Sequence, residues 1–135
     1  MGLKKGNKMN LIILLTMLFC HIVDDYYLQG WLASAKQREW WNKNAPNPLY
    51  KNDYTMALFM HSFSWSYMIM LPILVYSICS SVLWGLYPMF LILNCITHMA
   101  VDNMKANMLK INLIQDQGIH MLQIFVTWLI WILIK

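Results

Sequence analysis

Charged residues are scarce in this sequence. Asp, Glu, Lys and Arg make up 12% of its 135 residues and hydrophobic residues make up 59%, whereas an average soluble domain is about 25% charged. Between residues 54 and 101 none of these four residue types occurs. The composition excludes an ordinary soluble domain and indicates a small polytopic integral membrane protein.

Cysteine is also rare. The sequence contains Cys20, Cys79 and Cys95, none of which belongs to a Cys-x-x-Cys pair. An odd number of cysteines argues against a disulfide framework. All three lie in or at the edge of apolar runs, so we expect membrane-buried thiols that behave as small hydrophobic side chains.

A small residue is missing where a cleaved signal peptide would need one. Lys4, Lys5 and Lys8 followed by the apolar residues 11–19 resemble a signal peptide, and Cys20 suggests a lipoprotein site. However, the residue before that cysteine is the bulky Phe19, which does not suit cleavage. We therefore expect this segment to be retained as a helix.

Four apolar runs predict four membrane-spanning helices. A helix crosses about 30 Å of hydrocarbon with about 20 residues, so the charge-free stretch holds two crossings, with a reversal near residues 80–87. Pro88 suits an early helical position after this reversal. The sequence predicts an all-α fold with about four transmembrane helices in one bundle, forming a single domain over residues 1–135. The expected helices cover about residues 9–29, 54–79, 82–106 and 111–134.

Residues 30–53 form a polar connection that mixes basic and aromatic residues. We expect its first half to be a short helix in the lipid head-group plane, with Trp40 and Trp41 as interface anchors, and we expect residues 45–48 to end that helix. Basic residues beside apolar spans favour contact with the lipid bilayer rather than with nucleic acid, in keeping with a net charge of only +4.

The basic residues also bear on orientation. The face with the two longer connections carries six of them: Lys36, Arg38, Lys43, Lys51, Lys105 and Lys110. The opposite face carries four: Lys4, Lys5, Lys8 and Lys135. The positive-inside rule therefore favours a cytoplasmic location for the six-charge face.

The polar residues within the apolar runs form an ordered set. The first run ends with His21, Asp24, Asp25 and Gln29, the second contains His61, the third ends with His98, Asp102 and Lys105, and the fourth starts with Asp116, Gln117 and His120. Because chain direction alternates, these residues fall on the same side of the membrane as the 30–53 connection. Ionisable side chains are costly in hydrocarbon, so such a cluster indicates a functional site in the bundle interior.

This residue set suits metal binding. Imidazole and carboxylate without cysteine is the ligand chemistry of zinc, manganese or iron, and His and Asp four residues apart can chelate one ion from one helix face. The expected metal ligands are His21, Asp25, His61, His98, Asp102, Asp116 and His120. This surplus suggests two metal ions, or one ion with a base. The alternative is a hydrogen-bonded network that only fixes helix packing.

Three further residues are candidates for catalysis. We expect Asp24 or Asp116 to take up protons, and Lys105 to bind an anionic substrate group. Pairing of Lys105 with Asp102, or extension of its side chain to the interface, is the alternative. Gln29 and Gln117 suit hydrogen bonds to the metal ligands.

Taken in order, these motifs resemble a domain-of-unknown-function family of small bacterial and phage inner-membrane proteins. In that family a His-x-x-x-Asp and a Leu-Gln pair open the chain, a single His follows, and His-x-x-x-Asp-x-x-Lys and Asp-Gln-x-x-His close it. The likeness covers nearly the whole chain except residues 40–53, which look like an insertion. The family is similar to membrane-bound metal-dependent hydrolases, so the resemblance implies the bacterial inner membrane and the same metal ligands. Asp24 is one residue off the family spacing.

Three functions compete at this stage. The leading hypothesis is a metal-dependent hydrolase acting on a lipid-linked or anionic phosphoester. The second is a metal or proton transporter or channel, most easily a homo-oligomer, although the other half of each helix is expected to be uniformly apolar. The third is a phage-encoded membrane interaction protein, such as an inhibitor or a holin-like protein, which would leave the His and Asp motifs unexplained.

Overall fold

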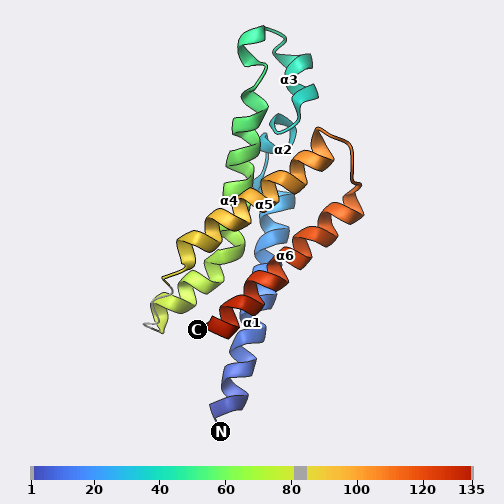
Figure 1. Cartoon of the computed structure of the whole chain (residues 1–135). Coiled ribbons are helices and arrows are strands. Elements are labelled where there is room, and N and C mark those ends of the chain that lie inside the picture. The colour runs from blue at the N-terminus through green and yellow to red at the C-terminus, as the bar shows by residue number, and fades with distance from the viewer. Residues whose placement is uncertain (1, 81–84, 135) are drawn as a thin grey trace.

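The computed structural model describes residues 2–80 and 85–134, and within them the chain forms helices and no strands (Figure 1). In chain order these are α1 (Gly2–Val23), the π-helix η1 (Asp24–Leu28), α2 (Leu32–Ala35), α3 (Arg38–Asn44), the 3₁₀ helix η2 (Pro48–Tyr50), α4 (Asp53–Cys79), α5 (Tyr87–Ala106) and α6 (Leu113–Ile134). The long helices α1, α4, α5 and α6 pack as one bundle (Figure 1). The predicted all-α fold is confirmed.

Three of the long helices are apolar enough to cross a membrane. The corresponding segments are Gly6–Leu28, Pro48–Cys79 and Leu113–Ile134. The remaining expected crossing is α5, whose 20 residues extend over about 30 Å. It is more polar than the other three because it buries Asn94, His98 and Asp102. The expected start of this helix at residue 82 lies outside the described residues.

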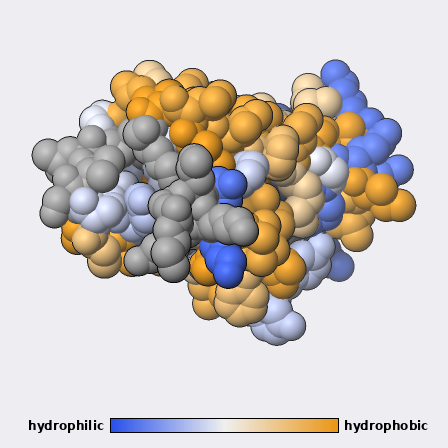
Figure 2. Space-filling model, turned by 90° about the horizontal axis from the view of Figure 1, so that it is seen from below, coloured by the Kyte–Doolittle hydropathy of each residue, from blue (hydrophilic) through white to orange (hydrophobic). Residues whose placement is uncertain are grey.

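The bundle is polar inside and apolar outside. Large hydrophobic side chains face outward along its helices, for example Phe19, Ile78 and Leu133, which are 64%, 70% and 75% exposed. Seen from the end that carries the two termini, the surface is mostly hydrophobic (Figure 2). Soluble monomers rarely expose apolar patches of this extent. The distribution is therefore compatible with insertion into a membrane.

The half of the bundle nearer the termini has a hydrophobic core. Every long helix contributes to it, and its buried members are Ile13, Met17, Trp65, Ile69, Met70, Ile73, Phe90, Ile124 and Trp131. α4 supplies many of these side chains and continues through Pro72 as one helix. The core closes this half of the bundle and leaves the ionisable residues at the other end.

A hydrogen-bonded group of uncharged polar side chains, Asn94, Gln123 and Thr127, lies within the same half. The Asn94 Oδ1 atom accepts hydrogen bonds from Gln123 Nε2 at 2.8 Å and from Thr127 Oγ1 at 3.1 Å. The expectation that this half is uniformly apolar is therefore wrong. The hydrogen bonds link α5 to α6 as interhelical polar contacts do in membrane proteins, which explains why polar residues without charge are tolerated there.

Up to residue 44, the connection between η1 and α4 forms two short helices, α2 and α3, rather than the one that was expected. α3 ends at Asn44, directly before Ala45 and Pro46, as the sequence predicts. Figure 1 shows α3 beside the first turns of α4, beyond the ends of α5 and α6. Trp31, Trp40 and Trp41 pack edge to face, with ring centroids 5.1–6.0 Å apart. This aromatic cluster holds α3 against the residues before α2.

We expect the substitution Asn94→Leu to lower the free energy of unfolding by about 1–2 kcal/mol, because it leaves the Gln123 amide and the Thr127 hydroxyl without their shared acceptor. The measurement is unfolding by SDS titration or steric trapping in micelles. Ile96→Leu, at an exposed position of the same helix, is the control and should be neutral. Equal stability of Asn94→Leu and wild type would contradict a stabilising role for this contact.

Candidate metal centre

The polar ends of the long helices meet at one level of the bundle. All four histidines are fully buried, and Asp24, Asp102 and Asp116 are 1–2% exposed. We call this level the polar layer, with members His21, Asp24, Asp25, His61, His98, Asp102, Asp116 and His120. The structure therefore brings every candidate metal ligand into one region, as the alternating chain directions predict.

A π-helical turn directs two neighbouring carboxylates into the bundle. Residues Asp24–Leu28 form η1, whose wider turn changes the register at the end of α1. Asp24 turns towards α4, where its Oδ1 accepts a hydrogen bond from Ser64 Oγ at 2.7 Å. Asp25 accepts hydrogen bonds from Gln29 Nε2 at 2.5 Å and from Gln117 Nε2 at 3.2 Å. The expected hydrogen bonds of both glutamines to a ligand carboxylate are thus present.

The Asp102 carboxylate is the centre of the polar layer. Its Oδ2 lies 2.5 Å from Lys36 Nζ, 2.8 Å from His61 Nε2 and 3.7 Å from His98 Nε2. Its Oδ1 lies 3.2 Å from His120 Nε2. Three imidazoles from three helices therefore turn the same ring nitrogen towards one carboxylate.

These contacts cannot all be hydrogen bonds. His61 Nε2 has Asp102 Oδ2, Lys36 Nζ and His98 Nε2 within 3.0 Å, yet one ring nitrogen offers either one N–H or one lone pair. Ligands held about 2.0–2.1 Å from a tetrahedral zinc ion lie roughly 3.3–3.4 Å from each other. The observed separations of 2.8–3.7 Å lie on either side of that value. The donor set and its spacing fit a divalent metal ion.

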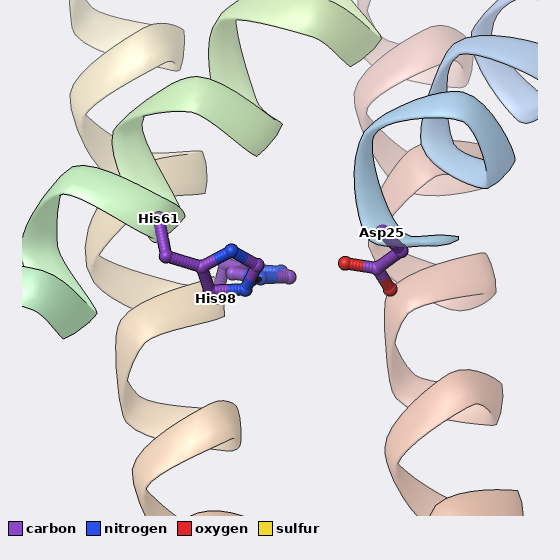
Figure 3. A group of neighbouring side chains, drawn as sticks. All are labelled: Asp25, His61 and His98. Atoms are coloured by element: carbon purple, nitrogen blue, oxygen red, sulfur yellow. Dashed lines mark hydrogen bonds between the residues drawn. The ribbon is translucent and has the colours of Figure 1, made fainter. Parts of the chain in front are cut away.

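Within the described residues, two overlapping groups of three candidate ligands have their ligand atoms close enough together to hold a metal ion. His98, Asp102 and His120 form the first, and Asp25, His61 and His98 form the second, with all ligand atoms in each group within 4.8 Å of one another. Figure 3 shows His61 and His98 side by side, with the Asp25 carboxylate facing them from the opposite helix. His98 belongs to both groups, and each ring nitrogen binds one ion, so the layer fits one ion with surplus ligands, or two ions if His98 uses both of its ring nitrogens.

Ring stacking fixes the orientation of the imidazoles. The His98 ring stacks against both the Trp65 ring and the His120 ring, with a centroid distance of 4.1 Å to each, and the centroids of those two rings are 5.3 Å apart. The Nδ1 atoms of His61, His98 and His120 form no hydrogen bond within the described residues. Metal-bound histidines usually donate this second N–H to a partner. Here the aromatic stack supplies the orientation instead.

His21 lies in the polar layer but in neither ligand group. Its Nδ1 accepts a hydrogen bond from Trp65 Nε1 at 2.7 Å, and its Nε2 lies 3.1 Å from Gln117 Oε1. An indole N–H can only donate, so Nδ1 carries the lone pair and the Nε2 proton is directed at the glutamine oxygen. Both nitrogens are engaged, which suits a positioning residue. Metal ligation by His21 stays a prediction.

Asp116 pairs with Lys105. Its Oδ2 lies 2.6 Å from Lys105 Nζ and its Oδ1 lies 3.4 Å from His120 Nε2. The alternative that Lys105 pairs with Asp102 is therefore not what the structure shows. Asp116 also accepts a hydrogen bond from Gln117 at 3.2 Å, so this amide joins the carboxylates of η1 and α6.

Lys36 contacts the polar layer, which the sequence did not reveal. It follows α2, and its ammonium contacts Asp102 Oδ2 and His61 Nε2. Asn107 fixes the backbone around it, because its amide donates to Lys36 O at 3.1 Å and its Oδ1 accepts from the Arg38 N–H at 2.7 Å. In sequence Lys36 is one of several basic residues in a polar connection, where the expected position is the lipid interface.

A cavity of about 390 Å³ lies beside the polar layer. Residues of η1, α5 and α6 and the segment around α2 line it, and the ionisable ones are Asp25, Tyr26, Lys36, Asp102, Lys105 and Asp116. The candidate ligands are thus next to a space of the size that small ligands occupy.

Comparison of the chain with protein-family models, with curated proteins and with solved structures gave no significant match.

We expect His21→Gln to retain bound metal with an affinity reduced about 10–100-fold, as is typical of residues that orient ligands. His98→Gln removes a nitrogen shared by both ligand groups and should lose the ion. Competition against a chromophoric zinc chelator measures both variants. Equal loss in the two variants would make His21 a ligand.

Proposed function

We propose that this chain is a metal-dependent hydrolase of the bacterial inner membrane. The observation that carries the proposal is the convergence of His61, His98 and His120 on the buried Asp102 carboxylate, at ligand spacing and beside a cavity. Zinc, manganese and iron suit these nitrogen and oxygen donors. The resemblance inferred from the ordered motifs supports the same reaction class.

The ligand groups assign roles within the polar layer. His98, Asp102 and His120 would hold an ion, together with His61, whose Nε2 lies 2.8 Å from Asp102 Oδ2. Asp25, His61 and His98 would form an alternative position for an ion, because a ring nitrogen that binds one ion cannot bind a second. Asp116, 3.4 Å from the His120 nitrogen, serves either as a further ligand or as a base.

The reaction is the hydrolysis of a phosphoester. When bound to these residues, a divalent ion would make hydroxide available from water near neutral pH and would polarise a phosphoryl oxygen. The water oxygen bonds to phosphorus, and the bond from phosphorus to the leaving oxygen breaks. One water proton goes to a carboxylate, which passes it to the leaving oxygen, and the other water proton stays with the phosphate. Asp116 suits this proton transfer because it lines the cavity. Asp24 is not among the residues that line the cavity. Its Oδ1 accepts a hydrogen bond from Ser64, so its role is to stabilise the polar layer.

The surroundings favour an anionic or lipid-linked substrate. The outer surface of the bundle is apolar, so a substrate with a hydrocarbon tail would concentrate around it. Lys36 and Lys105 line the cavity, and Arg38, Lys43 and Lys51 lie in the neighbouring connection. Cationic residues at this position attract anionic head groups. The positive-inside rule favours a cytoplasmic location for this side.

A transporter or channel is the second candidate. The Asn94, Gln123 and Thr127 contact extends polar character beyond the polar layer. However, Met17, Ile69 and Ile124, all fully buried, fill the bundle there, and a conduit would be lined by polar groups across its length. The closed core favours the hydrolase.

The first experiment is elemental mass spectrometry of detergent-purified protein, comparing wild type with the double variant His98→Ala/Asp102→Ala. We expect one or two equivalents of zinc, manganese or iron in the wild type and none in the double variant, which loses groups from both ligand sets. Metal-loaded wild type should then hydrolyse short-chain lipid phosphoesters, and the double variant should not.

Asp53→Ala is the matched control, because Asp53 is an acidic residue at the start of α4 outside the polar layer, and it should keep its metal. Wild type that binds no metal on titration would refute the hydrolase. Metal-dependent cation flux in sealed liposomes, without hydrolysis, would favour the transporter.

A further inference from the structure

Two ammonium groups line the cavity beside the candidate metal centre. Lys36 Nζ and Lys105 Nζ each hold a carboxylate of the polar layer, Asp102 at 2.5 Å and Asp116 at 2.6 Å. Their side chains are 14% and 34% exposed, so both reach the cavity surface. Lysine is a common partner for phosphate groups in proteins.

The same atoms that hold Lys36 are the atoms that a metal ion would need. Its ammonium contacts Asp102 Oδ2 and His61 Nε2, which are candidate ligands. A divalent ion and an ammonium repel each other at such distances. An ion at these ligands would displace Lys36, and rotation of its flexible four-carbon side chain would let the ammonium enter the adjoining cavity.

Metal binding also reverses the sign of the charge around the cavity. Its lining holds the carboxylates of Asp25, Asp102 and Asp116 and the ammonium groups of Lys36 and Lys105, which together carry one net negative charge when the histidines are neutral. One divalent ion makes this net charge positive. The cavity then attracts an anion, which it repels before the metal binds.

We propose that Lys36 and Lys105 form an anion subsite that binds the phosphate group of the substrate after metal has bound. This inference rests on the proposed metal-dependent function and adds the order of binding and the groups that hold the anion. The volume of about 390 Å³ matches a small phosphorylated head group. The phosphate belongs either to a lipid or to a soluble phosphoester.

The test is equilibrium dialysis of radiolabelled inorganic phosphate against the full-length protein in detergent, with zinc loaded or removed. We expect zinc-loaded wild type to bind phosphate at least about tenfold more tightly than the zinc-free protein. Lys36→Met and Lys105→Met should each weaken binding to the loaded protein about tenfold, because each removes a charge-assisted hydrogen bond.

Lys43→Met is the matched control. It removes the same charge from the same connection, but Lys43 does not line the cavity, so phosphate binding should be unchanged. Lys36→Met should also bind zinc more tightly than wild type, since the competing ammonium is gone. Opposite shifts for zinc and phosphate in one variant separate the subsite from simple misfolding.

Competing ligands identify the source of the phosphate. Stronger competition by dihexanoyl phosphatidic acid than by glycerol 3-phosphate supports a lipid head group, and equal competition supports a soluble phosphoester. Zinc-loaded wild type that binds no phosphate, or Lys36→Met and Lys105→Met that bind it as tightly as Lys43→Met, would overturn the subsite alone. A wild type that takes up no zinc would overturn the proposed function as well.

Discussion

The Asp102 carboxylate is 2% exposed in the interior of a bundle with an apolar outer surface, and a charge in that position must be compensated. Leaving one buried charge without its partner costs about 3–5 kcal/mol. The compensation comes from Lys36 after α2, His61 of α4 and His120 of α6. Because these partners belong to three separate elements, the requirement fixes how the elements meet. The helices must end at one level, and the connection after η1 must fold back over it.

The connections satisfy this requirement through specific contacts. α5 ends beside the segment that carries Lys36, and Asn107, directly after α5, binds the backbone of Lys36 and Arg38. The turn to α6 contains Leu109 with a φ of 53°, a left-handed conformation that is uncommon for leucine. It brings Asp116 within reach of Lys105. Lys36 thus reaches the polar layer from the connection after α2 and Lys105 from the last turn of α5, and each neutralises one of its carboxylates.

The long helices and the set of polar residues could be predicted from the sequence, but the pairing of these residues could not. Long charge-free runs predict membrane helices. The i, i+4 spacing of His98 and Asp102 places both on one helix face independently of tertiary contacts. Pairing depends on tertiary geometry. Lys36 reaches Asp102 over a separation of 66 residues, and a basic residue in a polar connection carries no signal for such a contact. Trp65 was likewise indistinguishable from a core residue, although it binds His21 and stacks on His98.

The hydrogen bonds of the polar layer also determine what metal binding would involve. Each carboxylate there already has a partner: Ser64 for Asp24, Gln29 and Gln117 for Asp25, Lys36 for Asp102, and Lys105 for Asp116. The fold therefore does not need an ion to compensate its buried charges, in contrast to small zinc domains that are unfolded without metal. Binding an ion exchanges hydrogen bonds and ion pairs for coordination bonds within a preformed bundle. The metal affinity would then be the difference between two sets of strong contacts, and Lys36, which holds the central carboxylate, would lower it.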